Sequence, residues 1–186
     1  MGFFSLILGY LPGSIPSGWL AGRWLKGIDV RELGSGSTGA TNVLRQVGKG
    51  PALVVFLIDV GKGAAAVLIT RAFGQSDWIQ VLAGLTALAG HIWPVWLKFK
   101  GGKAVATGFG MFLGLAWPVG LASFGVFLLT LAIFRIVSLS SVLAAVSLPL
   151  LMICFSVIGS YNLIALVAMG LVLWRHRSNL ARILKG

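Results

Sequence analysis

Six long apolar runs dominate this 186-residue chain and restrict what it can fold into. A helix that crosses a bilayer needs about 20 predominantly apolar residues. The runs fall at Phe3–Leu25, Ala52–Ala72, Trp78–Leu97, Ala104–Phe134, Ile136–Ile158 and Tyr161–Trp174. Charged residues make up 10% of the chain, whereas a soluble domain has about 25%. The sequence therefore predicts an all-α integral membrane protein, with residues 1–186 as a single domain.

The fourth run, Ala104–Phe134, is longer than one span needs and contains the pair Trp117-Pro118. Its length fits either one long helix or two helices folded as a hairpin. Positive charge distinguishes these alternatives, because cytoplasmic loops of membrane proteins are rich in Lys and Arg. With two helices, all but two of the fifteen basic residues fall on one side; Arg71 lies on the far side and Lys62 within a span. We therefore expect seven transmembrane helices, with the N-terminus outside and the C-terminus cytoplasmic.

The net charge of +11 has two possible readings. In a soluble protein it would point to nucleic acid. Here the charges stand in short clusters between apolar runs, so we expect membrane lipid and small anions as partners, and no nucleic acid. The lone cysteine, Cys154, lies inside an apolar run and supports neither a disulfide nor a cysteine metal site.

The first polar segment, GSGSTGATN at Gly34–Asn42, follows the first apolar run. Its three glycines let the backbone turn sharply and direct successive N–H groups into one concavity, which suits an anion. Serine, threonine and asparagine side chains add neutral hydrogen-bonding groups. Arg45 follows, where its planar guanidinium can pair with a phosphate. The alternative is a flexible linker, but a linker needs neither Asn42 nor Arg45.

Two further polar segments have the same character. In Lys98–Thr107, the pair Gly101-Gly102 precedes an expected helix, whose N-terminal N–H groups favour an anion. Lys103 adds a full positive charge there. In Trp174–Arg182, His176 and Asn179 stand at i and i+3 and would share one helix face. For both segments the alternative function is anchoring to anionic lipid.

Other polar residues lie within or beside the apolar runs. Asp59 and Lys62 are i,i+3 in the second run and are expected to pair, either as a structural ion pair or as part of a site wall. His91 fits helix packing better than a functional role. Ser140 and Ser141 stand where they can face the same site as the loops. With four acidic residues in the chain and no pair spaced like a metal site, we expect no metal and no cofactor.

The motifs GSGSTGATN, GGKAVAT and RHRSNLARILKG, in this order among these runs, resemble the acyl-phosphate:glycerol-3-phosphate acyltransferases, the PlsY family. The resemblance covers essentially the whole chain. It implies transfer of a fatty acyl group from acyl phosphate to the 1-hydroxyl of glycerol 3-phosphate, which gives lysophosphatidic acid and inorganic phosphate in bacterial phospholipid biosynthesis. It also implies a multi-pass protein of the bacterial inner membrane, and a soluble acyl-phosphate-producing enzyme as a partner. We expect a monomer.

Both implied substrates carry phosphate, which accounts for two anion sites. The donor is expected to bind the first segment, at Ser35, Gly36, Ser37, Thr38, Gly39, Thr41, Asn42 and Arg45. Glycerol 3-phosphate is expected to bind Gly102, Lys103, Ser141, His176 and Asn179. The predicted catalytic residues are Arg45, Lys103 and His176. The proton acceptor is either His176 or the phosphate of the donor itself, and the scarcity of carboxylates favours the phosphate.

Two rival functions fit a basic membrane protein. One is a transporter for a phosphorylated solute, but transporters place their sites near the midplane, between broken helices of repeated halves. The other is a non-catalytic scaffold, which would not require glycine-rich anion loops. The polar motifs of this chain gather in loops at one face, which favours the acyltransferase.

Overall fold

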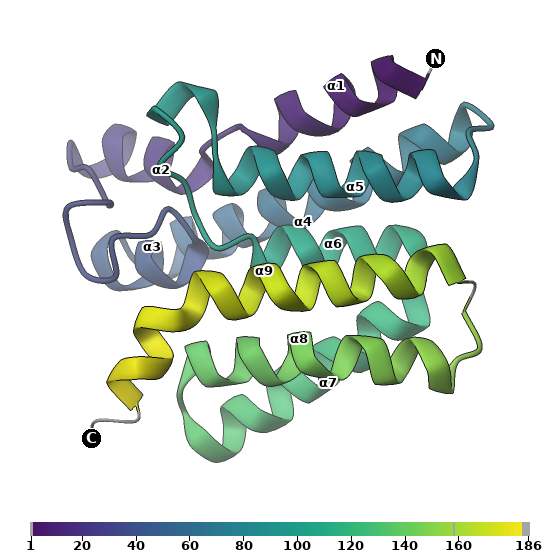
Figure 1. Ribbon diagram of the computed structural model, residues 1–186. Helices are drawn as coiled ribbons and strands as arrows, with labels where there is room; N and C mark the ends of the chain where they lie inside the picture. The colour runs from purple at the N-terminus through teal and green to yellow at the C-terminus, as the bar shows by residue number, and fades with distance from the viewer. Residues whose placement is uncertain (1, 158, 184–186) are drawn as a thin grey trace.

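The computed structural model describes residues 2–157 and 159–183, and within these ranges every regular element is a helix (Figure 1). The elements are α1 (Gly2–Gly13), α2 (Ser17–Lys26), α3 (Ala40–Gln46), α4 (Lys49–Ala72), α5 (Asp77–Ile92), the 3-10 helix η1 (Val95–Leu97), α6 (Val105–Leu115), α7 (Trp117–Phe134), α8 (Val137–Cys154) and α9 (Gly159–Ile183). The all-helical prediction is confirmed.

The first apolar run forms two helices, where the sequence predicted one uninterrupted span. α1 ends at Gly13 and α2 begins at Ser17. Pro16 precedes α2 and lacks the N–H group that would continue the hydrogen-bond ladder. At the break, the Ser14 hydroxyl donates to the carbonyl of Leu11 (2.7 Å) and accepts from the Trp96 indole (2.9 Å).

The fourth run divides where the sequence predicted. α6 ends at Leu115, Ala116 links the helices, and Pro118 lies in the first turn of α7, where its missing N–H costs nothing. α6 has 11 residues and so extends about 16 Å, against a hydrocarbon core of about 30 Å. α6 by itself is therefore too short to cross a hydrocarbon core of that thickness.

Small residues bring α4 and α6 close together. A Cβ atom added at Gly110 would overlap the carbonyl of Val60, and one at Gly114 would press on the side chain of Val67. On α4, Gly63 lies equally close to the carbonyl of Thr107. Close backbone approach through small residues is the usual packing of membrane helices. It fixes α6 and the loop before it against α4.

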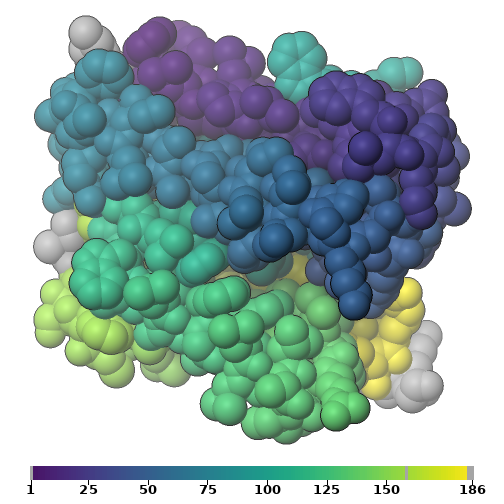
Figure 2. All heavy atoms as spheres, turned by 180° about the vertical axis from the view of Figure 1, so that it is seen from behind, coloured from purple at the N-terminus to yellow at the C-terminus, as the bar shows by residue number. Residues whose placement is uncertain are grey.

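The outer surface is apolar. Among the residues that the structure describes, four helical stretches are long and apolar enough to cross a membrane, by length and composition: Lys49–Ala72, Asp77–Leu97, Trp117–Phe134 and Val137–Cys154. Large side chains on them are exposed, for example Leu129 (63%) and Ile133 (62%) on α7, which contributes to the face shown in Figure 2. Such a surface suits lipid as its solvent.

The polar segments gather at one end of the helix bundle, on the left in Figure 1. The loop between α2 and α3 and the end of α9 lie there, and the segment that leads into α6 comes from that side, whereas Arg71 lies at the other end of α4. α9 runs without a break through the third segment, so His176 and Asn179 belong to one helix. Lys185, which the charge argument also counted, lies outside the described residues.

Candidate active site

A cavity of about 380 Å³ brings the three polar segments together. The segments contribute Ser35, Ser37, Gly39, Thr41, Asn42, Arg45, Lys103, His176 and Asn179. Ser141 of α8 joins them, whereas Ser140 is fully buried elsewhere in the helix packing. Figure 2 shows a hollow between α4 (blue) and the green hairpin of α7 and α8, with pale yellow atoms of α9 at its floor. Residues far apart in the sequence thus line one cavity.

The glycine-rich loop takes its shape from Asn42. The Asn42 amide donates to the carbonyls of Val30 (2.7 Å), Ser37 (3.0 Å) and Leu33 (3.1 Å). Its oxygen accepts from the backbone N–H of Ser35 (3.1 Å). Asn42 is 1% exposed, although it borders the cavity. Both polar atoms of the Asn42 amide are therefore bonded to the backbone of the loop. Asn42 holds the loop in a shape that a ligand can bind, and does not offer the ligand a free amide.

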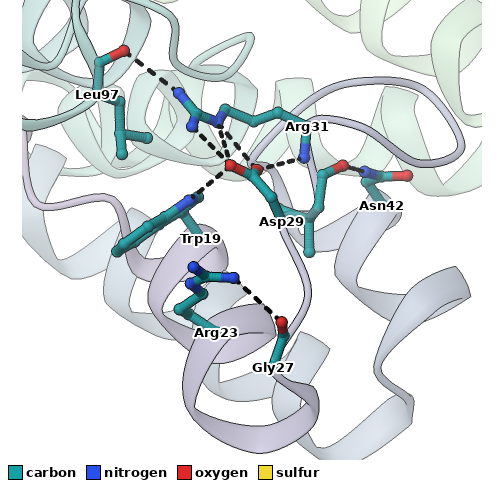
Figure 3. Close-up of polar contacts among 8 residues, drawn as sticks. Trp19, Arg23, Gly27, Asp29, Arg31, Asn42 and Leu97 are labelled. Carbon is teal, nitrogen blue, oxygen red and sulfur yellow. Dashed lines mark hydrogen bonds and ion pairs between the residues drawn. The ribbon is translucent and has the colours of Figure 1, made fainter.

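A second group of bonds ties this loop to the rest of the site (Figure 3). The Asp29 carboxylate accepts from the Arg31 guanidinium at 2.6 Å and from the Trp19 indole at 3.1 Å. Arg31 also donates to the carbonyl of Leu97 (3.3 Å), at the end of η1. The hydrogen bond from Arg31 holds the pKa of Asp29 well below its usual range, so the pair stays ionised. Sequence reasoning missed this connection between the first two segments.

The second segment turns sharply before α6. Lys98, Phe99 and Ala104 adopt left-handed backbone conformations, with φ of 53°, 61° and 58°. The N–H groups of Gly101 and Gly102 donate to the carbonyls of Ile92 and His91, both at 3.1 Å, so the turn is bonded to the end of α5. Gly102 therefore lies behind the cavity wall and does not line the cavity. The next residue, Lys103, does line it.

Lys103 sits among positive groups. Its ammonium donates to the side-chain oxygen of Asn179. Burial, together with the charges of Arg182, Arg175 and Arg45, lowers the pKa of Lys103 to about 8. Such a cluster of cations in a half-buried place attracts an anion. The predicted meeting of Lys103 with Asn179 is thus observed, and Arg175 and Arg182 add to the positive field.

His176 presents one free ring nitrogen. Its Nδ1 lies 2.9 Å from the carbonyl of Val172, and because a carbonyl oxygen can only accept, Nδ1 carries the proton of the neutral ring. Burial, reinforced by Lys103 and Arg175, lowers the pKa of His176 to about 4. Near pH 7 the ring is therefore neutral, and Nε2 can accept a hydrogen bond.

Arg175 stabilises the second segment from α9. Its guanidinium donates to the carbonyls of Gly102 (2.9 Å) and Gly101 (3.4 Å). The neighbouring Trp174 ring lies 5.5 Å from Arg175, 5.1 Å from Arg177 and 6.0 Å from the Trp93 ring. From the sequence, Arg175 was expected only to anchor the chain to anionic lipid, because basic residues after a membrane span are common.

The inner arm of the cavity is apolar. Phenylalanine rings of α4, α6 and α7 stack along it, with centroid separations of 4.6 Å for Phe109–Phe124 and 6.4 Å for Phe56–Phe124. Leu148 and Ala168 extend this lining on α8 and α9. The cavity thus has a cationic mouth and an apolar arm, which suits an amphiphile with a phosphate head and a hydrocarbon chain.

A smaller hollow of about 210 Å³ adjoins the loops. It is lined by Ser35, Gly36, Ser37, Gly101, Lys103, Trp174, Arg175, Arg177 and Ser178. Gly36 and three basic side chains therefore face this hollow, and Thr38, which is 4% exposed, faces neither. Ser35, Ser37 and Lys103 border both hollows.

Residues 3–186 match the family model of glycerol-3-phosphate acyltransferase. The chain belongs to this family. A glycerol-3-phosphate acyltransferase of Parasynechococcus marenigrum (strain WH8102) is 73% identical over 181 residues, which cover 97% of this chain and 85% of the relative. One of Prochlorococcus marinus (strain MIT 9313) is 68% identical over 185 residues, covering 98% and 91%.

A solved structure agrees with this assignment. The crystal structure of PlsY, an integral membrane glycerol 3-phosphate acyltransferase, in its glycerol 3-phosphate form has a TM-score of 0.94 to this chain. The two are 39% identical, with 100% of this chain and 92% of that chain covered. The lysophosphatidic acid form of PlsY has a TM-score of 0.92. The predicted family, enzyme class and integral membrane fold are confirmed, and the transporter alternative is not supported.

Proposed function

We propose that this glycerol-3-phosphate acyltransferase takes its acyl group from acyl phosphate and releases lysophosphatidic acid and inorganic phosphate. The observation that carries the proposal is the cavity of about 380 Å³ with a cationic mouth and an apolar arm. Two phosphate-bearing substrates need several cations and backbone N–H groups, and an acyl chain needs apolar walls. PlsY in its glycerol 3-phosphate and lysophosphatidic acid forms supports the same acceptor and product here.

The substrates divide between the polar segments. The loop Ser35–Thr41 and Arg45 bind the phosphate of the donor, whose chain follows the row of phenylalanine rings. Lys103, Ser141, His176 and Asn179 bind glycerol 3-phosphate. The Ser141 hydroxyl donates to the carbonyl of Val137 (2.8 Å), so its oxygen is oriented to accept from a substrate hydroxyl. Arg45 and Lys103 then stabilise negative charge as the transfer proceeds.

The transfer needs no covalent enzyme intermediate. The 1-hydroxyl oxygen of glycerol 3-phosphate attacks the carbonyl carbon of the donor, and the bond from that carbon to the phosphate oxygen breaks. The hydroxyl proton passes to the departing phosphate. A phosphate monoester takes up a proton with a pKa of about 6, whereas the pKa of His176 is lowered to about 4. The phosphate is therefore the stronger proton acceptor, and His176 Nε2 orients the acceptor substrate.

The proposed topology has seven crossings, with α1 and α2 together making the first and α4 to α9 the others. The N-terminus lies outside and the C-terminus in the cytoplasm of a bacterial cell, at its inner membrane. The basic groups at the site end of the bundle support this orientation, since positive residues remain on the cytoplasmic side. A single 186-residue unit acts as a monomer and receives acyl phosphate from a soluble enzyme.

The test uses the purified protein in detergent micelles with palmitoyl phosphate and glycerol 3-phosphate. We expect equal amounts of phosphate and lysophosphatidic acid, measured by a colorimetric phosphate assay and by mass spectrometry. Palmitoyl-CoA in place of palmitoyl phosphate should give no product. Product from palmitoyl-CoA, with none from palmitoyl phosphate in a folded sample, would overturn the proposed donor.

A further inference from the structure

A buried ion pair lies beneath the two loops and has no part in the chemistry above. Asp59 and Lys62 of α4 are 2.8 Å apart, with their side chains 1% and 6% exposed. Buried ion pairs are often no more stabilising than apolar side chains of similar size, because both charges lose their water. Charged residues at membrane depth therefore call for a functional explanation.

One end of this pair holds the break between α1 and α2. The Lys62 ammonium donates to the carbonyl of Ile15 (3.1 Å), which lies in the break before Pro16. The Asp59 carboxylate accepts from the hydroxyl of Ser17 (2.7 Å), the first residue of α2. The next residue, Gly18, packs so closely on the carbonyl of Thr38 that an added Cβ would overlap it. The ion pair thus fixes the part of α2 on which the glycine-rich loop rests.

The other end reaches the turn before α6. The same Asp59 oxygen lies 3.6 Å from Nδ1 of His91, which in turn lies 3.1 Å from the hydroxyl of Thr107. The His91 carbonyl accepts from the N–H of Gly102, and the His91 ring lies directly beneath Gly102. A Cβ at Gly102 would overlap Nε2 of His91 and come within 3.0 Å of the Thr38 hydroxyl. Thr38, His91 and Gly102 therefore meet at one point.

We propose that Asp59, Lys62 and His91 are positioning residues that fix the distance between the glycine-rich loop and Lys103. One polar chain runs from the α1–α2 break, through α4 and α5, to the turn that carries Lys103. Asp59 and His91 border the cavity, but Oδ1 of Asp59 contacts Ser17 and Lys62, and Nδ1 of His91 contacts Thr107. The inference rests on the proposed role of Lys103 in binding glycerol 3-phosphate.

The main test replaces both charges by apolar side chains, in the double variant Asp59→Leu/Lys62→Met. No unpaired charge remains, so we expect a melting temperature in detergent close to that of the wild type. A misplacement of about 1 Å can cost roughly 100-fold, so the KM for glycerol 3-phosphate should rise roughly 10- to 100-fold. If melting temperature and KM both stay at wild-type values, the pair only fills space and the proposal is wrong.

Single variants keep the test decisive if the double variant does not fold. Thr107→Val removes one hydroxyl from a fully buried residue that does not border the cavity. It frees the His91 ring, and the KM for glycerol 3-phosphate should rise about 5-fold, as for one lost hydrogen bond. His91→Gln should raise it further. An unchanged KM in both variants would overturn the proposal.

A matched control lies at the other end of the bundle. The Tyr161 hydroxyl donates to Asp77 (3.0 Å) and lies 3.2 Å from the Gln80 oxygen. Tyr161→Phe should lower the melting temperature and leave the KM for glycerol 3-phosphate unchanged. If Tyr161→Phe raised this KM as much as the positioning variants do, KM would merely follow stability and the inference would be refuted. Lys103→Met distinguishes the proposed substrate division from the positioning role. If it leaves the KM for glycerol 3-phosphate unchanged, the proposed substrate division fails; if it raises KM and the double variant does not, the positioning role alone fails.

Discussion

Removal of the Asn42 side chain tests whether the glycine-rich loop is a preformed site. The structure shows three donations from the Asn42 amide and one acceptance by its oxygen. An amide has two hydrogens, so the three donations share them, and the side chain provides about three full hydrogen bonds. At about 1 kcal/mol for each bond, Asn42→Ala should destabilise the ordered loop by about 3 kcal/mol.

Destabilisation of the ordered loop should weaken the binding of acyl phosphate. If the substrate must order the loop before binding, the KM for acyl phosphate rises by the same factor as the ordered fraction falls. About 3 kcal/mol corresponds to a rise of at most roughly 100-fold, since each 1.4 kcal/mol is tenfold. The KM for glycerol 3-phosphate should change much less, because Lys103 and His176 are held by other contacts.

Hydrogen exchange of the substrate-free protein is the deciding measurement. In Asn42→Ala, exchange over residues 33–39 should accelerate before any substrate is added. Thr41→Val is the comparison, since Thr41 borders the cavity and makes none of the four loop bonds. It should raise the KM for donor without faster exchange. If Asn42→Ala raises KM while exchange stays at the wild-type rate, Asn42 is a direct ligand and the reasoning is refuted.

Three further predictions concern individual side chains. The pKa of Lys103 is lowered to about 8, so its charge is lost as pH rises through 8, and kcat/KM for glycerol 3-phosphate should fall above that pH. Lys103→Arg should remove this fall in kcat/KM. A fall that persists in Lys103→Arg would come from another group. His176→Ala should raise the KM for glycerol 3-phosphate roughly tenfold with little change in kcat; a collapse of kcat at constant KM would make His176 the base. Phe124→Ala enlarges the apolar arm, so the ratio of kcat/KM for C18 over C12 acyl phosphates should rise relative to the wild type, and an unchanged ratio would place the chain elsewhere.

Features that depend on run length, charge and residue spacing along the chain were predictable. The division of the fourth run followed from its length and from the charge of Arg135, and the structure places the helix break at Ala116. The shared face of His176 and Asn179 followed from their spacing, which α9 preserves. The break in the first run was not predicted, because Pro16 near the end of an apolar run is compatible with a kink as well as a stop.

The roles of individual loop residues were harder to predict. Asn42 and Thr41 are neighbours of similar polarity, and both were assigned to the donor. The structure turns the Asn42 amide toward loop carbonyls and leaves Thr41 at the cavity. A polar side chain next to a glycine-rich turn can bind either the backbone or a ligand, and the sequence does not show which. The role of the Asp29–Arg31 pair was not predicted for a different reason: its third partner, Leu97, is distant in the sequence.

The structure also changes the simple division in which the two phosphates bind separate polar segments. Ser35, Ser37 and Lys103 border both the large cavity and the smaller basic hollow, so the first and second segments meet at a shared wall. Two phosphates bound on either side of that wall would repel each other unless a cation stood between them. Lys103 occupies this place, and its pKa is lowered by its burial and by the positive groups already gathered there. A charge shared by both substrates stabilises the ternary complex more than either binary complex, so binding of one substrate should strengthen binding of the other.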